Sequence, residues 1–458
     1  MGMSSAAMKA FAIVLIVTCV FLCPARAADP RLVFAHYMLF ANDNIDVLKQ
    51  EIRIAQSKGI DAFALNSNVW RQNLVDNMYQ AAREVGSSFK IFFSADIHKD
   101  ANGNLTPDQL VTMLTRYETH PNQMKYRGKP LFTSWLGNDD SWWAEYGYSS
   151  ALSGWNDVFQ RAGGRGKFFF VPFFPTDGSY WGVRGTAEKF TDVVDGMFAW
   201  DTSAWPYISP DFQNPSGSKD QNYLTACNDI GKVYMASPSP WFFKNILGTC
   251  CSDACKAKDL NSCNCQVKGN YQGPGLWIKK WEQLIQLSPP LVEIVTWNDW
   301  VESSYVAPPL STASADVAGF THRAFLELGQ YYISWYKSGS PPAITRDSLF
   351  MFYYTHSKNV ILPADGCQVL YSDQLTDKLY VTSMLTGPAT VELRSGSSSA
   401  TFNAPAGVST WALDFEDGQQ VAVLRRGGSV ISTLTGSKPI GSSVNYNFNV
   451  YSTCTTCI

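Results

Sequence analysis

The chain has 458 residues, 16% of them charged, and a formal net charge of -3 at pH 7. It contains no run of Lys and Arg, and because nucleic acids and anionic membrane surfaces are bound by concentrated basic patches, this composition argues against both partners. The length exceeds what one hydrophobic core usually fills, so we expect two domains or one unusually large one.

The first residues are typical of a secretory signal peptide. Lys9 precedes a nearly unbroken apolar run over residues 10–23, and Ala25 and Ala27 provide a small-residue cleavage site. We therefore expect residues 1–27 to be removed and the mature protein to be secreted. The run is short for a transmembrane helix and no later segment is long, apolar and uncharged, so we expect no membrane-spanning part.

The cysteines fit a secreted protein. Of the 11 Cys, two lie in the signal segment, and in an oxidising route the remaining nine should pair with one left over. Five of them lie between Cys250 and Cys265, which permits a zinc knot or a disulfide-stapled loop. Their spacing matches no common zinc pattern and no His is near, so we expect disulfides. Cys454 and Cys457 are a redox pair or a structural bridge, and the bridge is favoured at the end of a secreted chain.

From Arg31 onward, short apolar runs alternate with amphipathic helical segments, a pattern that predicts a parallel sheet. Eight runs are predicted strands: Leu32–Met38, Ile60–Asn66, Lys90–Ala95, Lys129–Trp135, Lys167–Phe173, Gly196–Trp200, Val233–Ser237 and Val292–Thr296. Predicted helices between and after them include Ile45–Ser57, Leu110–Arg116, Ser153–Arg161, Ala187–Val194, Tyr223–Ile230, Leu276–Leu287 and Ala324–Trp335. Eight such units predict a (β/α)8 barrel, the TIM barrel, over residues 28–338.

The composition changes near Ser338-Gly-Ser-Pro-Pro342. Beyond this point helical patterns are few, and short runs rich in Ser, Thr, Gly and Val are separated by turn residues. The predicted strands are Tyr380–Thr382, Ala389–Leu393, Val408–Leu413 and Val421–Leu424. We therefore expect residues 339–458 to form a smaller, β-sandwich-like accessory domain.

In a barrel of this kind, reactive groups follow the carboxyl ends of the strands. The polar and aromatic residues at those positions are His36, Asn66, Asp96, His98, Trp135, Asp177, Asp201, the segment from Ser237 to Trp241 and the segment from Trp297 to Glu302. The sequence has no nucleophile elbow, no phosphate-binding loop and only 5 His. We therefore expect neither a metal nor a cofactor. Two carboxylates among aromatic walls are instead what cleavage of a glycosidic bond requires.

Asp299 and Glu302 are the strongest candidates for this pair. They lie within four residues of each other, beside Trp297 and Tyr305, after the last predicted strand. The other strand-end residues permit simpler interpretations, because acids at such positions often cap helices or accept buried hydrogen bonds. Asp96, Asp201 and His36 are therefore either substrate ligands or structural residues.

Several segments resemble family 71 of the glycoside hydrolases, the fungal α-1,3-glucanases or mutanases. The segments are Val33-Phe-Ala-His-Tyr-Met38, Gly59-Ile-Asp-Ala-Phe-Ala-Leu-Asn66, Ser237-Pro-Ser-Pro-Trp-Phe-Phe243, Val292-Glu-Ile-Val-Thr-Trp-Asn-Asp-Trp-Val-Glu-Ser303 and Phe402-Asn-Ala-Pro-Ala-Gly407. The resemblance runs from about Arg31 into the C-terminal part. It implies a barrel with a C-terminal β-sandwich, inverting hydrolysis of α-1,3-glucan in fungal cell walls or mutan, and catalysis by Asp299 and Glu302.

The resemblance and the strand-end positions together give a set of expected partners and ligands. The substrate is a polysaccharide, and we expect a monomer located outside the cell or in the cell wall. The expected substrate-binding residues are His36, Asn66, Asp96, Asp201, Trp205, Trp241, Trp297, Asn298 and Tyr305. Two other functions remain open, namely hydrolysis of another glucan and a catalytically silent carbohydrate-binding wall protein.

The chain departs from the family motif near the two acids. Val301 replaces a usual Gly, and Ser304 stands where His is usual, while the cysteine-rich insert after Asn245 is also unlike the family. Inversion implies carboxyl groups roughly 6.5–9.5 Å apart. We expect Glu302, beside Val301 and aromatic rings, to be the general acid, and Asp299, beside the polar Asn298, to be the base that activates water.

Overall fold

The computed structural model describes residues 30–39, 44–86, 88–99, 103–203, 218–245, 265–267, 273–310, 317–360, 372, 375–441 and 447–457. The predicted signal peptide, Trp205 and most of the cysteine-rich loop lie outside these ranges. Within them, no helix is long and apolar enough to cross a membrane.

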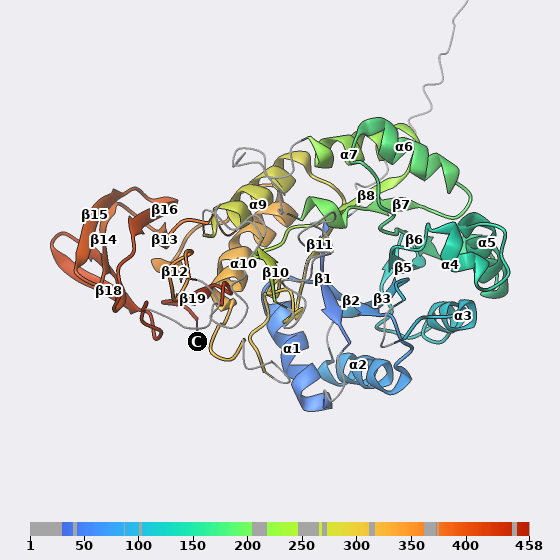
Figure 1. The fold of residues 1–458 in the computed structure, drawn as a ribbon, viewed down its shortest axis with the longest axis horizontal. Coiled ribbons are helices and arrows are strands. Elements are labelled where there is room, and N and C mark those ends of the chain that lie inside the picture. Colours follow the sequence, from blue (N-terminus) through green and yellow to red (C-terminus); the bar gives the residue numbers. More distant parts are fainter. Residues whose placement is uncertain are drawn as a thin grey trace, which may run out of the picture. The chain divides into compact units, whose positions relative to one another are not determined.

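A nine-stranded sheet curls through the N-terminal part of the described chain (Figure 1). Its hydrogen-bonded order is β4-β5-β3-β2-β1-β11-β8-β7, with β6 paired to β5. Apart from the antiparallel β4, the strands pair in parallel. They are β1 (Leu32–Met38), β2 (Ala62–Ser67), β3 (Lys90–Asp96), β4 (Lys125–Tyr126), β5 (Lys129–Trp135), β6 (Phe169–Phe170), β7 (Gly196–Phe198), β8 (Val233–Ala236) and β11 (Leu291–Ile294).

Each of the eight predicted strands overlaps one strand of this sheet, but β6 is shorter than predicted. Its predicted start, Lys167, belongs to a 3-10 turn over Arg165–Lys167, and Pro172 near its predicted end has no N–H to donate. Two backbone hydrogen bonds join this segment to β7. Asp195 N–H donates to Phe170 O at 2.8 Å and Phe198 N–H donates to Pro172 O at 2.8 Å, so the segment that contains β6 lies beside the segment that contains β7.

Helices connect the strands and cover the outside of the sheet (Figure 1). They are α1 (Ile45–Ser57), α2 (Gln72–Val85), α3 (Pro107–Thr115), α4 (Asp140–Ala144), α5 (Ala151–Arg161), α6 (Tyr180–Lys189), α7 (Lys219–Asp229), α9 (Gly275–Leu287) and α10 (Arg323–Ser338). Helix α1 has the predicted bounds because Asn44 caps it, accepting from Val47 N–H at 2.9 Å, and because Leu48, Ile52 and Ala55 bury one face.

The helix predicted over Ala187–Val194 is wrong in its bounds. The Ser179 side chain accepts from Gly182 N–H at 3.0 Å, which caps a helix that begins at Tyr180. This helix, α6, ends at Lys189, and the buried Val193 and Val194 follow it as a loop that leads into β7. The helix therefore lies earlier in the chain than predicted.

Within its described residues, the C-terminal part contains two four-stranded antiparallel sheets. One has the order β16-β13-β12-β19 and the other β15-β14-β17-β18. The strands are β12 (Ser348–Tyr353), β13 (Lys378–Leu385), β14 (Ala389–Ser395), β15 (Ser398–Ala404), β16 (Gly407–Asp414), β17 (Gln420–Arg426), β18 (Ser429–Thr435) and β19 (Tyr451–Cys454). Both sheets contribute to one cluster of buried side chains, which includes Met351, Val381, Leu393 and Leu424. All four strands predicted from the sequence overlap strands observed here.

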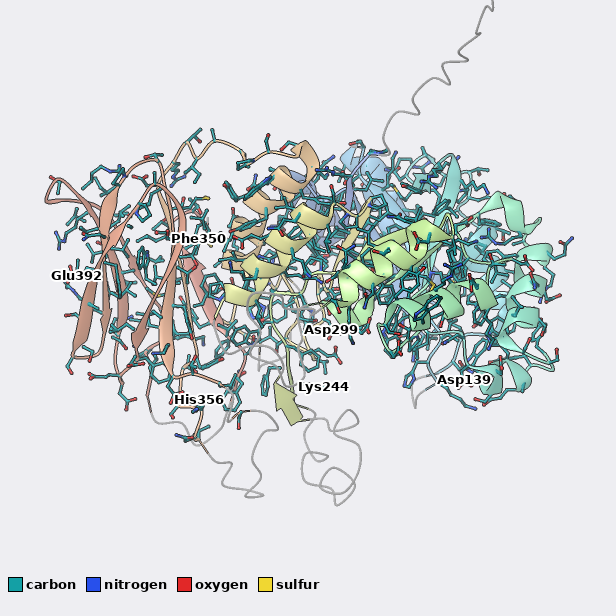
Figure 2. All side chains as sticks on the ribbon, turned by 90° about the horizontal axis from the view of Figure 1, so that it is seen from above. Asp139, Lys244, Asp299, Phe350, His356 and Glu392 are labelled. Atoms are coloured by element: carbon teal, nitrogen blue, oxygen red, sulfur yellow. A yellow bond between two sulfur atoms is a disulfide. The ribbon has the colours of Figure 1, made fainter. Side chains whose placement is uncertain are left out.

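Helix α10 ends at Ser338 and packs against β12 and β19. The predicted bridge between Cys454 and Cys457 is confirmed, with a Cα–Cα distance of 5.1 Å. Cys227 on α7 is a buried free cysteine, and burial raises the pKa of its thiol to about 12. Figure 2 shows the side chains across both parts of the chain.

Candidate active site

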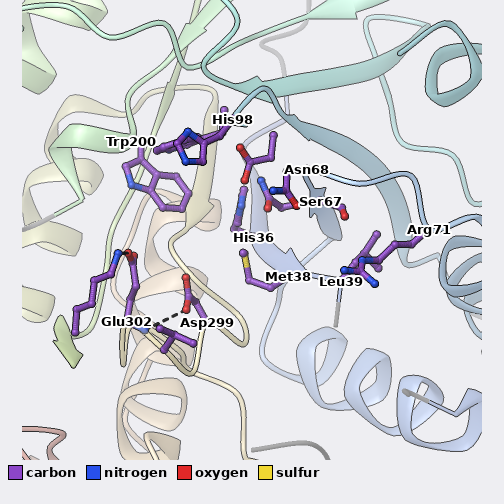
Figure 3. A pocket seen from close by; sticks show the side chains of 15 residues that line it. His36, Met38, Leu39, Ser67, Asn68, Arg71, His98, Trp200, Asp299 and Glu302 are labelled. Atoms are coloured by element: carbon purple, nitrogen blue, oxygen red, sulfur yellow. Dashed lines mark hydrogen bonds and ion pairs between the residues drawn. The ribbon is translucent and has the colours of Figure 1, made fainter. Parts of the chain in front are cut away.

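A cavity of about 590 Å³ opens at the carboxyl ends of the parallel strands (Figure 3). Its walls combine carboxyl, imidazole, amide and aromatic groups. The described residues that line it are His36, Met38, Leu39, Asn66, Ser67, Asn68, Arg71, Asp96, His98, Trp135, Trp200, Lys244, Asp299, Val301 and Glu302.

Alternation along the strands brings the predicted ligands into this cavity. On β1, Phe34 points into the cluster inside the curled sheet, whereas Val33 and Ala35 belong to the cluster between sheet and helices. Because side chains alternate between the faces of a strand, His36 shares the inner face with Phe34. The same rule carries Asn66 on β2 and Asp96 on β3 into the cavity.

The His36 ring contacts a buried carboxylate. Its Nδ1 lies 2.7 Å from Oε1 of Glu293 on β11, and the side chains are 1% and 0% exposed. The second oxygen of Glu293 has no hydrogen-bond partner among the described residues. This contact fixes the imidazole in the floor of the cavity.

Four rings form a continuous edge-to-face wall from His36 to His98. The His36 and Trp200 rings are 4.8 Å apart, Trp200 and Trp135 are 6.3 Å apart, and Trp135 and His98 are 5.9 Å apart. The interplanar angles lie between 73° and 84°, an arrangement that aromatic rings favour. The Trp135 indole N–H and Asn66 Oδ1 have no hydrogen-bond partner within the described chain, so both offer polar atoms to a ligand.

A tight turn after β11 places the two predicted acids. Asp299 N–H donates to Thr296 Oγ1 at 2.9 Å, and Asp299 Oδ1 accepts from Glu302 N–H at 3.1 Å. Phe243 N–H donates to Glu302 O at 2.9 Å, which ties the turn to the neighbouring strand β9 (Phe243–Asn245). Figure 3 shows Asp299 and Glu302 on the same side of the cavity.

The two acids have different surroundings, and these are the reverse of the sequence-based expectation. Asp299 is 8% exposed, and burial, followed by the charge of Glu302, raises the pKa of its carboxyl to about 7. Glu302 is more exposed, and its Oε1 lies 3.1 Å from Lys244 Nζ. The expectation that Glu302 has the more apolar setting is therefore wrong, because the buried acid is Asp299.

The two departures from the family motif have different positions. Val301 is 51% exposed and lines the mouth of the cavity. Ser304 is buried outside the cavity lining, where its Oγ lies 3.2 Å from Thr296 Oγ1 and its carbonyl accepts from Thr296 N–H at 2.9 Å. Ser304 therefore supports the residue that holds Asp299, whereas Val301 faces the cavity.

Four of the predicted binding residues are packed beneath the site and do not line the cavity. Asn298 Oδ1 accepts from Met38 N–H at 2.7 Å, and its amide donates to Met38 O at 3.0 Å, which fixes the end of β1. Trp297 is fully buried, with its ring 5.0 Å from Phe63. These two residues therefore stabilise the walls of the site.

The other two, Tyr305 and Trp241, join the N-terminal part to the C-terminal segment. The Tyr305 ring stacks on His322 at 4.0 Å, and its hydroxyl accepts from Asn449 Nδ2 at 2.8 Å. The Trp241 indole donates to Phe448 O at 3.0 Å. Trp205, the remaining aromatic candidate, lies outside the described residues.

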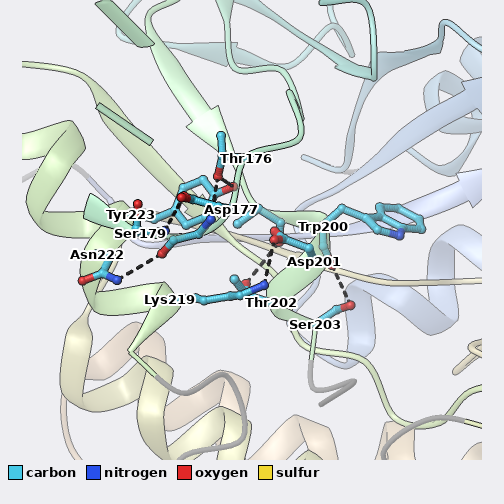
Figure 4. Close-up of polar contacts among 12 residues, drawn as sticks. Thr176, Asp177, Ser179, Trp200, Asp201, Thr202, Ser203, Lys219, Asn222 and Tyr223 are labelled. Carbon is cyan, nitrogen blue, oxygen red and sulfur yellow. Dashed lines mark hydrogen bonds and ion pairs between the residues drawn. The ribbon is translucent and has the colours of Figure 1, made fainter. Parts of the chain in front are cut away.

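Asp201 also lies outside the cavity lining. Figure 4 shows its carboxyl directed toward Lys219, at 3.3 Å, and the Trp200 ring directed the other way. Burial raises the pKa of Asp201. The short turn over Trp200–Thr202 thus presents its aromatic residue, not its acid, to the cavity.

Three further residues, Trp200, Arg71 and Lys244, line the cavity although they are not among the predicted site residues. Trp200 ends a predicted strand, so the strand-end rule contained the signal for it. Arg71 and Lys244 follow loops whose course only the fold reveals. Within the described part of the chain, no group of three or more His, Cys, Asp or Glu side chains is arranged to hold a metal ion.

Comparison with known proteins identifies relatives along almost the whole chain. The family model described as glycosyl hydrolase family 71 matches residues 29–457. The glucan endo-1,3-alpha-glucosidase agn1 of Schizosaccharomyces pombe is 30% identical, over 88% of this chain and 89% of its own. A mutanase of Penicillium rubens is 28% identical, over 93% of this chain and 88% of its own.

A second Schizosaccharomyces pombe protein, an ascus wall endo-1,3-alpha-glucanase, is 27% identical over 94% of this chain and 98% of its own. Among solved structures, an endo-alpha-mannosidase from Bacteroides thetaiotaomicron matches with a TM-score of 0.48 and 12% identity, over 67% of this chain and 98% of that chain.

Proposed function

The chain belongs to glycosyl hydrolase family 71 and is a glycoside hydrolase, and from this premise we propose that it hydrolyses the α-1,3-glucosidic bonds of α-1,3-glucan with inversion. The observation that carries the proposal is the pair of acids, Asp299 and Glu302, which face one cavity at the carboxyl end of the sheet. The names of the relatives, which include two α-1,3-glucanases and a mutanase, indicate the substrate.

The environments of the two acids suggest their roles. Asp299, whose pKa is raised to about 7 by burial, keeps a proton near neutral pH and serves as the general acid that protonates the leaving oxygen. Glu302, paired with Lys244, serves as the carboxylate that activates water. Inversion requires room for this water, so the two carboxyl groups should lie roughly 6.5–9.5 Å apart when substrate is bound.

The cavity walls suggest how a glucosyl unit is held. Asn66 Oδ1 accepts and the Trp135 indole N–H donates hydrogen bonds to sugar hydroxyls, since neither atom has a protein partner in the described residues. His36, oriented by Glu293, and Asp96 contact further hydroxyls, while the Trp200 ring packs against the apolar face of a sugar. Asp201, Trp241, Trp297, Asn298 and Tyr305 lie behind these contacts and hold the walls.

The same proposal includes the architecture and location of the protein. The eight parallel strands form a closed (β/α)8 barrel, supported by the hydrogen bonds between the backbones near β6 and β7. The two C-terminal sheets form a β-sandwich around their common buried cluster. The signal-like residues 1–27 direct the protein out of the cell, where a monomer acts on glucan of the cell wall.

The substrate is tested by incubating the purified protein with insoluble α-1,3-glucan, and in parallel with starch, laminarin and dextran. We expect reducing sugars from α-1,3-glucan above all, with equal yield in the presence of a chelator, because two acids perform the chemistry without a Lewis acid. Preference for another glucan contradicts the substrate assignment. Loss of activity with chelator, restored by zinc or calcium, contradicts the metal-free mechanism.

The raised pKa of Asp299 predicts how turnover depends on pH. A general acid must carry its proton, so kcat should fall as the pH rises through about 7. A pH profile of kcat on soluble α-1,3-linked oligosaccharides measures this fall. If kcat does not fall between pH values of about 6 and 8, the assignment of Asp299 as the general acid is wrong.

The pH dependence of protein stability provides an independent test of the raised pKa of Asp299. The stability that protonated Asp299 contributes is complete below its ordinary pKa of 3.8 and is lost as the pH rises through about 7. Asp299→Asn removes this dependence. The free energy of unfolding of the wild-type protein should therefore fall more steeply between pH values of about 4 and 8 than that of Asp299→Asn.

A further inference from the structure

Arg71 lines the cavity on the wall that lies opposite the two acids. Figure 3 shows its side chain on the far side of the cavity from Asp299 and Glu302, with Met38 between them. The guanidinium group therefore faces the space that a ligand fills, but it lies away from the bond that the acids would cleave.

The turn that carries Arg71 is fixed by its own contacts. Ser67, at the end of β2, donates from Oγ to Val69 O at 2.6 Å and accepts from Val69 N–H at 3.2 Å. The Trp70 ring packs against Phe93 on β3, with the ring centroids 5.9 Å apart. Helix α2 begins directly after Arg71. The backbone of Arg71 is therefore positioned by β2, β3 and α2 together.

The side chain of Arg71, in contrast, has no protein partner in the described part of the chain. Arg71 immediately precedes α2, but its side chain makes no hydrogen bond that caps the helix. Its Nε is buried without a hydrogen-bond partner among the described residues, and no ion pair or ring contact joins the guanidinium group to them. A buried donor without a partner costs free energy. The arrangement is therefore better explained by a ligand that supplies acceptors than by a structural role.

The chemistry of the cavity indicates the class of this ligand. A guanidinium group offers five N–H donors in one plane and no acceptor, so it binds carboxylates, phosphates or pairs of hydroxyl oxygens. Asp96, Asp299 and Glu302 line the same cavity, and their carboxyl groups disfavour an anionic ligand. The hydroxyl groups of a neutral sugar fit both walls, because they accept from Arg71 and donate to carboxylates.

We propose that Arg71 binds a glucosyl unit remote from the scissile bond, by donating hydrogen bonds to its hydroxyl oxygens. This inference rests on the proposed function, because it takes the ligand to be a glucan chain that extends from the acids across the cavity. Contacts to a remote unit align the chain and supply binding energy that is used at the reacting bond. Arg71 therefore contributes more to the turnover of long substrates than of short ones.

Kinetics on α-1,3-linked oligosaccharides of increasing length test this contribution. Arg71→Met should lower kcat/KM on the longest substrate by about ten- to a hundredfold, the effect of losing hydrogen bonds from a charged donor, and the loss should shrink as the chain is shortened. Arg71→Lys keeps the charge but loses the planar set of donors, so its loss should be intermediate. Arg83→Met is the matched control, because Arg83 is exposed in the last turn of α2 and does not line the cavity. This control should keep the wild-type values at every length.

Binding measurements separate this role from catalysis. Isothermal titration calorimetry with the same oligosaccharides uses Asp299→Asn protein, in which turnover is slow. Adding Arg71→Met should weaken binding of the longest oligosaccharide by about ten- to a hundredfold, whereas adding Arg83→Met should not change it. No loss of affinity, or an equal loss at every chain length, overturns the proposal.

Two further outcomes have distinct meanings. If sulfate binds to the wild-type protein and not to Arg71→Met, while binding of oligosaccharides is unchanged, Arg71 serves an anion and the proposal is wrong. Inactivity of the wild-type protein on α-1,3-glucan overturns the proposed function instead. Titration with oligosaccharides from starch, laminarin and dextran then tests whether Arg71 binds a glucosyl unit of another glucan.

Discussion

Asp299→Asn and Glu302→Gln should each lower kcat on α-1,3-glucan by about 100- to 10,000-fold, the range expected when a general acid or base is removed. Both changes replace a carboxyl by an amide of nearly the same shape, so folding and binding to insoluble glucan should be preserved. Asp177→Asn is the matched control, because Asp177 is an exposed acid that follows a strand of the same sheet but does not line the cavity. Near-normal activity of either catalytic variant would remove that residue from the mechanism.

Chemical rescue separates the roles of the two acids. An aryl α-1,3-oligoglucoside with a good leaving group needs no protonation, so Asp299→Asn should retain most of its turnover on this substrate. Glu302→Gln should remain slow, but added azide should restore turnover and yield a glycosyl azide of inverted configuration. The opposite pattern of rescue would assign the acid to Glu302 and the base to Asp299.

Lys280→Met should destabilise the protein by about 3–5 kcal/mol, because it leaves a buried charge without its partner. Lys280 on α9 and Asp220 on α7 form a fully buried ion pair, with both side chains 0% exposed. The Tyr234 hydroxyl donates to the other oxygen of Asp220 at 2.5 Å. In Lys280→Met, Asp220 must either remain charged in the core or take up a proton, and both cost free energy.

The measurement is the midpoint of chemical and thermal unfolding, in a double-mutant cycle with Asp220→Asn. The double variant should recover much of the loss, since it has no buried charge. Lys279→Met is the control, because this neighbouring lysine is 41% exposed and should change stability by less than about 0.5 kcal/mol. A loss no larger than that of the control would show that Asp220 is not held as a charged group.

Sequence patterns predict the strands of the sheet well, because the pattern that identifies a buried strand lies within the strand itself. β1 and β5 have the predicted bounds, since an apolar run and its polar stop are contained in the segment itself. The failures have physical causes outside the pattern. β6 is shortened by a 3-10 turn and by Pro172, and α6 begins at a Ser cap that the apolar periodicity does not contain.

The strand-end rule brought His36, Asn66 and Asp96 to the cavity because side-chain alternation is fixed along a strand. It does not apply to the loop after β11, where neighbours of the acids turn into the core. Asn298 is buried because it bonds to the backbone of Met38, 260 residues away. No local pattern contains such a contact.

The different environments of the two acids could not be predicted from the sequence either. Burial of Asp299 results from the fold of the whole turn, and the charge beside Glu302 comes from Lys244, 58 residues earlier in the chain. The residues adjacent in the sequence predict the opposite environments for the two acids. Electrostatics at a site depends on distances in space, which the order of residues does not give.

The most direct test of the central claim is proton NMR of the first products released from α-1,3-glucan by the wild-type protein. Inverting hydrolysis by Asp299 and Glu302 predicts that the β-anomer appears first and that the α-anomer grows later by mutarotation. Appearance of the α-anomer first would show retention and contradict the mechanism. Absence of any product from α-1,3-glucan would contradict the proposed activity itself.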